Sequence, residues 1–171
     1  MSTYFVTETY LKVKTPITQN VDVNEITPFI STNSDMRIQP ILGTYFYDDI
    51  LTKYNAQTLS ADETTLVEKI QPCIAWYAAS DAVFALTYQL KNKGLQKQNG
   101  DFSESVTPDE VTLGMDHYQQ KAAFYEMRMR RWLVKNKALF ANFTSSSNVD
   151  SDMKPDTTET NTGYTNNILI I

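Results

Sequence analysis

The sequence predicts a mainly α-helical protein, built as a small helical bundle with a long C-terminal helix, a short β-hairpin, and extended N- and C-terminal arms. Two observations favour this class: apolar residues recur at helical spacing over long segments, and strong helix-start signals precede those segments. At 171 residues and 42% hydrophobic, the chain can bury the core of one domain. We expect an N-terminal arm over 1–21, a helical core over 22–143 and a flexible tail over 144–171.

The N-terminal segment has weaker signals than the rest of the chain. Residues 3–14 partly alternate apolar and polar side chains before Pro16, which favours an extended arm or an edge strand. Asp22 and Glu25 could start a short helix, which we expect Pro28 to limit.

Two long helices are predicted after residue 60. Ser60 and Glu63 form a capping box ahead of the first, and Pro72 should kink or restart it. The second begins at Thr107-Pro108, which combine an N-cap residue with proline at the first helical position. Its apolar stripe should pack against other helices, and we expect Tyr118, Tyr125, Met129 and Trp132 to be buried there. The stripe consists of Val111, Met115, Tyr118, Ala122, Tyr125, Met129 and Trp132.

Glycines mark the expected interruptions. Gly43 predicts a break within the helical segment 36–54, and Gly94 is a candidate C-cap for the first long helix. Asn99-Gly100 is typical of a type I′ turn, so we expect a small hairpin around it.

Charge argues against general nucleic-acid binding, because the net charge of −5 would be repelled by phosphate backbones. Between residues 126 and 137, however, five bases accompany a single acid. That stretch can be a solvated face paired with the acidic remainder of the protein, a subunit interface, or a phosphate-facing patch. The candidate interface residues there are Arg128, Arg130 and Arg131.

No residue set indicates catalysis or a cofactor. The single cysteine, Cys73, lies on an apolar helix side, which favours a buried structural thiol and excludes an internal disulfide. His117 is the only histidine, and we expect it to be exposed or at the edge of the core. Metalloprotease, nucleotide-binding and hydrolase motifs do not occur. The sequence therefore predicts a protein that is not an enzyme, although catalysis by carboxylates alone stays open.

No apolar run approaches the roughly 18 residues that span a bilayer, and the N-terminus lacks the features of a signal peptide. We therefore expect a soluble protein without membrane contact.

The C-terminal region changes composition abruptly. Residues 144–164 are mostly Ser, Thr, Asn and Asp, which cannot bury enough surface to fold alone. Four large apolar residues follow, namely Ile168, Leu169, Ile170 and Ile171. We expect a tether whose apolar end docks on a neighbouring subunit, the alternative being a frayed terminus.

Three segments resemble head–tail connector proteins of tailed bacteriophages, especially the ring or adaptor proteins of crAss-like phages. They are MRIQPILGTYFYDDIL at 36–51, KNKGLQKQNGDFSES at 91–105, and TPDEV with FYEMRMRRWL within 107–133. The resemblance covers roughly residues 20–140, and its motifs are packing and turn patterns.

This resemblance implies a structural virion protein at the head–tail interface, made in the cytoplasm of the host bacterium. Such proteins form a closed homo-oligomeric ring, here a dodecamer, that docks under the portal protein, contacts other tail or ring proteins, and lines the DNA channel without sequence-specific binding. The family supplies no catalytic residues and no cofactor. A small helical nucleic-acid-binding or packaging accessory protein is the alternative.

Overall fold

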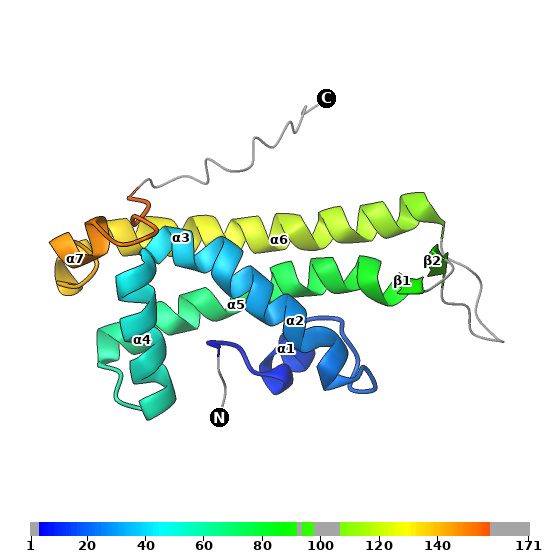
Figure 1. Ribbon diagram of the computed structural model, residues 1–171, viewed down its shortest axis with the longest axis horizontal. Coiled ribbons are helices and arrows are strands. Elements are labelled where there is room, and N and C mark those ends of the chain that lie inside the picture. The colour runs from blue at the N-terminus through cyan, green and yellow to red at the C-terminus, as the bar shows by residue number, and fades with distance from the viewer. Residues whose placement is uncertain (1–3, 92–93, 98–106, 158–171) are drawn as a thin grey trace.

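The computed structural model describes residues 4–91, 94–97 and 107–157. It confirms the mainly helical class, and two long helices organise it: α5 (Ala61–Thr87) and α6 (Pro108–Lys135). They run antiparallel and pack along their length, and α6 forms one edge of the elongated molecule (Figure 1).

Both long helices begin where the sequence predicts. Ser60 Oγ accepts a hydrogen bond from the Glu63 backbone N–H, and the Glu63 carboxylate accepts one from the Ser60 N–H. Thr107 and Glu110 form the same reciprocal pair at the start of α6. Each box satisfies two backbone donors that the first turn would otherwise leave unpaired.

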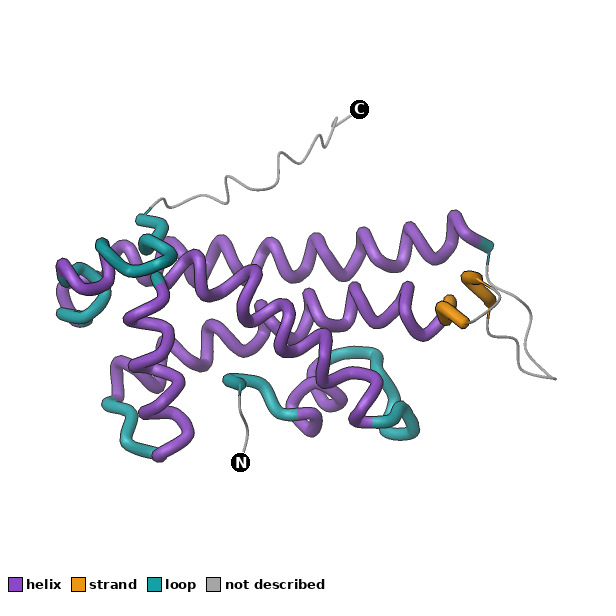
Figure 2. The backbone as a smooth tube through the Cα atoms, viewed as in Figure 1, coloured by secondary structure: helices purple, strands orange, loops and turns teal. Residues whose placement is uncertain are grey.

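The shorter helices pack beside this pair (Figure 2). Helices α1 and α2 lie against α5, and a π-helical turn, η1, joins α2 to α3. Helix α4 precedes α5, and a 3-10 turn, η2, and α7 follow α6. Their bounds are α1 Glu8–Lys14, α2 Val23–Asn33, η1 Ser34–Ile38, α3 Gln39–Leu42, α4 Thr44–Ala56, η2 Lys137–Leu139 and α7 Ser146–Val149.

The prediction of an extended N-terminal arm is wrong. Helix α1 lies in the middle of it, and the Thr7 hydroxyl caps this helix by accepting a hydrogen bond from the Tyr10 N–H at 3.1 Å. Phe5 and Leu11 are fully buried in the core, so the segment is part of the folded unit. The partial apolar and polar alternation of residues 3–14 suggested an extended segment. Burial of one face of the helix outweighs that local preference.

The hairpin expected around Asn99-Gly100 is not supported, because those two residues lie outside the described part of the chain. Helix α5 ends at Thr87, and a short antiparallel pairing follows between β1 (Tyr88–Lys91) and β2 (Gly94–Lys97). Gly94 therefore begins a strand and is not the C-cap of α5.

Prolines interrupt the helices less than the sequence suggests. Helix α2 continues through Pro28 and α5 continues through Pro72 without a restart. The break at Gly43 is confirmed, because Gly43 separates α3 from α4 at φ 80° and ψ 147°. Only glycine adopts this backbone conformation readily.

The core forms where α5 meets α6 and the N-terminal helices. Met129 is fully buried, whereas Tyr118, Tyr125 and Trp132 are half-buried, so the predicted burial of these four side chains is correct only in part. The largest fully buried side chains come from most of the helices: Phe5, Leu11, Ile26, Ile38, Ile41, Leu42, Phe46, Ile50, Leu66, Ile70, Ile74 and Phe143.

Candidate interaction surface

The arginine-rich stretch divides between the interior and the surface. Arg130 is 7% exposed, and its Nε donates a hydrogen bond to the Glu126 carboxylate at 2.8 Å. A second guanidinium nitrogen of Arg130 pairs with Asp156. Arg130 therefore holds the chain together internally and is removed from the predicted interface, since a buried arginine must keep its carboxylate partners.

Arg128 and Arg131 are exposed, as the prediction requires. They lie on the same outward face of α6 as Phe124 and Lys135. The Arg128 guanidinium is 5.6 Å from the centre of the Phe124 ring. This contact lets Arg128 cover part of an exposed aromatic side chain while its charge stays in water.

A shallow groove of about 470 Å³ lies next to Phe124, between α5 and α6. Within it, the Lys121 ammonium sits 4.4 Å from the centre of the Trp76 ring. Sequence reasoning missed this groove, although Lys121 and Phe124 follow His117 at helical spacings of four and seven. It is lined by Trp76, His117, Gln120, Lys121, Phe124 and Tyr125.

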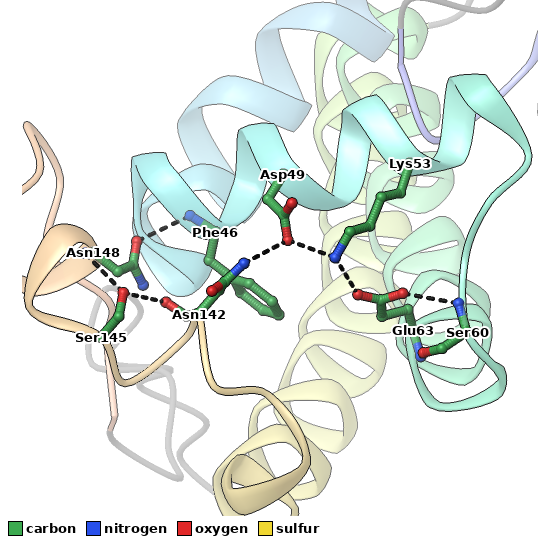
Figure 3. A network of polar contacts seen from close by, with 8 residues as sticks. All are labelled: Phe46, Asp49, Lys53, Ser60, Glu63, Asn142, Ser145 and Asn148. Carbon is green, nitrogen blue, oxygen red and sulfur yellow. Dashed lines mark hydrogen bonds and ion pairs between the residues drawn. The ribbon is translucent and has the colours of Figure 1, made fainter.

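Polar contacts tie α4 to its neighbours (Figure 3). The Lys53 ammonium donates to Asp49 at 2.9 Å and to Glu63 at 2.7 Å, so it joins α4 to the start of α5. Burial opposes ionisation of Glu63, but its hydrogen bonds with Lys53 and Ser60 outweigh that effect and lower its pKa. Asp49 and Glu63 thus belong to a structural network of charged side chains.

The segment after α6 is anchored by Asn148, which is fully buried. Its side-chain oxygen accepts a hydrogen bond from the Phe46 N–H at 3.1 Å, and its amide nitrogen donates to the carbonyls of Leu42 at 2.8 Å and Phe143 at 2.9 Å. Gly43 cannot cap α4 with a side chain, so Asn148 supplies the cap from a distant part of the sequence (Figure 3).

This anchor corrects the expectation of a flexible tail from residue 144. Residues up to 157 are described, and backbone contacts hold them to α3 and α4, with Thr44 N–H donating to Met153 C=O and Asp156 N–H to Ile41 C=O, both at 3.1 Å. The candidate residues Ile168, Leu169, Ile170 and Ile171 lie outside the described residues, so their docking stays a prediction.

The single cysteine and the single histidine lie in different environments. Cys73 is fully buried, as predicted, and its thiol donates to the Lys69 carbonyl at 3.2 Å. Burial, reinforced by the charge of Glu126, raises the pKa of Cys73 well above its usual value. His117 is exposed on α6. In the described part of the chain, no three His, Cys, Asp or Glu side chains are grouped to hold a metal ion.

None of the described helices is long and apolar enough to cross a membrane.

Comparison with known families gives one match, to the family of unknown function DUF6712, over residues 38–153. This chain belongs to that family. The DUF6712 match runs from the end of η1 through α7 and includes both Gly43 and Asn148, whereas α1 and α2 precede it. No curated protein and no solved structure matches the chain.

Proposed function

We propose that this DUF6712 protein is a non-enzymatic structural component of a tailed-bacteriophage virion, a head–tail connector whose subunits form a ring between portal and tail. The proposal starts from the sequence resemblance at 36–51, 91–105 and 107–133. The described parts of these segments include the η1 to α4 region, β2 and most of α6. In the proposed assembly the ring binds the portal protein and other tail or ring proteins at the head–tail interface of the virion.

The observation that carries the proposal is that polar side chains connect the helices to one another. Polar side chains join one helix to another: Tyr77 of α5 donates a hydrogen bond to Glu126 of α6, and Lys53 of α4 pairs with Glu63 of α5. Residues 142–156 are tied to the same scaffold. Such bracing suits a subunit that transmits force between partners, because paired groups fix the helices relative to one another.

DNA would pass through the proposed ring without sequence-specific binding. The net charge of −5 supports this, since an acidic wall repels phosphates. The accessory nucleic-acid-binding alternative now depends on Arg128 and Arg131, because Arg130 is paired with Glu126 and Asp156.

The test is electron microscopy and native mass spectrometry of the full chain, alone and mixed with the portal protein of the same proposed virion. We expect a closed ring that caps the portal and has its rotational symmetry. A protein that stays monomeric with the portal present would remove the proposal. A DNA affinity that falls steeply with salt and is lost in Arg128→Glu would favour the accessory alternative.

A further inference from the structure

The outward face of α6 carries an exposed stripe, hereafter the α6 stripe. Its two large apolar members are unusually accessible, with Leu113 71% and Phe124 51% exposed. Every other member is exposed too. The α6 stripe consists of Leu113, His117, Gln120, Phe124, Arg128, Arg131 and Lys135, at helical spacings of three and four.

Charge changes sign along this face. Exposed Asp109 and Asp116 lie in the first half of α6, and Arg128, Arg131 and Lys135 lie in the second. Among the described residues, none of these five forms an ion pair. The face therefore presents separated, uncompensated charges on either side of Phe124, a pattern that favours a partner with the opposite order.

An antiparallel second copy of α6 presents its charges in the opposite order. Consider a two-fold axis that meets the α6 stripe at the level of Ala122. Asp109 and Lys135 lie thirteen positions before and after Ala122, and Asp116 and Arg128 lie six before and after it. Because each residue turns the helix by about 100° and advances it by about 1.5 Å, members of such a pair are displaced equally and oppositely, so they face each other across the axis.

We propose that α6 pairs with α6 of a second copy of this chain, antiparallel and two-fold symmetric, through the α6 stripe. Asp109 and Asp116 then meet Lys135 of the partner subunit and Arg128 of the partner subunit. Leu113 packs on the aliphatic stem of the partner's Arg131. Phe124 lies over the partner's Gln120, at the edge of the groove that His117 and Lys121 line.

Parallel pairing is excluded by the same charges, since it would set Arg128 against Arg128 of the partner subunit and Asp109 against Asp109 of the partner subunit. The contact is also independent of the proposed ring. A ring closes through heterologous contacts, whereas this contact joins one surface to itself.

The size of the contact sets its strength. A 28-residue helix is about 42 Å long, and a stripe about 10 Å wide would bury on the order of 400 Å² on each copy. This is below the range of stable complexes, so we expect a dimer that forms at micromolar concentration and weakens with added salt.

A disulfide test fixes the register. Leu113 and Arg131 face each other across the proposed axis, but within one chain they are about 27 Å apart, too far for a bridge. Under mild oxidation, the full chain carrying both Leu113→Cys and Arg131→Cys should form a covalent dimer, while Leu113→Cys alone should not. Cys73 is buried and should not interfere.

Sedimentation equilibrium supplies the second test. Phe124→Ser should raise the dimer dissociation constant at least tenfold, whereas the matched control Val13→Ser, 67% exposed on α1, should leave it unchanged. Asp116→Arg and Arg128→Asp should each weaken the dimer, and the double variant should restore it.

A chain that is monomeric at all concentrations overturns the inference. So does a dimer that is insensitive to Phe124→Ser, or a double charge reversal that does not recover. If Phe124→Ser disturbs folding by circular dichroism, the disulfide and charge-reversal variants still decide the question. A ring with the portal but no α6 dimer would leave the connector proposal standing and remove this one.

Discussion

Replacing Asn148 tests the claim that a polar residue in the C-terminal segment holds α3 and α4 in place. Asn148→Ala removes two donated hydrogen bonds and one accepted hydrogen bond, each to a buried backbone group of Leu42, Phe46 or Phe143. Each broken bond leaves a backbone group that costs about 1 kcal/mol or more to bury unpaired. We therefore expect the free energy of unfolding to fall by about 3 kcal/mol.

For a chain of this length, that loss lowers the melting temperature by roughly 6–12 °C. Urea unfolding followed by circular dichroism measures the free energy directly. Ser147→Ala, an exposed change in the same helix, is the control and should be nearly neutral. Asn148→Asp should be at least as damaging at neutral pH, because a carboxylate would face two carbonyl oxygens. A loss below about 1 kcal/mol for Asn148→Ala would refute the capping argument.

Four further predictions concern other parts of the scaffold. Gly43→Ala should cost about 3 kcal/mol, because its φ is 80° and the new Cβ would lie 2.7 Å from the Asn148 amide nitrogen; wild-type stability would contradict this. Trp132→Ala should cost on the order of 3 kcal/mol in urea unfolding, since Trp132 packs on the core beside Phe140, and a fully solvent-like fluorescence of Trp132 would argue otherwise. Cys73 should resist thiol reagents in the native state at pH 8 and react on unfolding; rapid native labelling would disprove its burial. The pKa of Glu63 is lower in the folded than in the unfolded chain, so its ion pair stabilises the fold fully above the unfolded pKa of about 4.3 and less as pH falls through the folded pKa. Glu63→Gln should therefore make the free energy of unfolding fall less steeply at acid pH. An unchanged acid dependence would contradict the ion pair.

Local signals in the sequence predicted the helix starts well. Ser60 with Glu63 and Thr107 with Glu110 act within three residues, so their hydrogen bonds do not depend on the rest of the fold. Gly43 likewise marked a real break. These features needed no knowledge of tertiary contacts.

Long-range polar contacts could not be predicted in the same way. Asn148 lies in a stretch whose composition is typical of a linker, and its partners are about a hundred positions away in sequence. Asp81 of α5 likewise accepts a hydrogen bond from Asn33 of α2 at 2.6 Å, across 48 positions of sequence. Amino-acid composition does not indicate either of these long-range hydrogen bonds.

The burial of Arg130 was indicated by the sequence, but the prediction gave more weight to its neighbouring arginines. It lies four positions after Glu126 and next to the apolar stripe of Met129 and Leu133, a spacing typical of a partly buried ion pair. Grouping it with Arg128 and Arg131 by sequence proximity ignored that Arg130 points to a different side of the helix from those two exposed residues.

Electron microscopy of the full chain mixed with the portal protein of the proposed virion tests the proposed function most directly. The connector proposal predicts a closed ring with the portal's symmetry, seated under the portal and open along its axis. A chain that remains monomeric in the presence of the portal, or that binds it without forming a ring, would contradict the proposal.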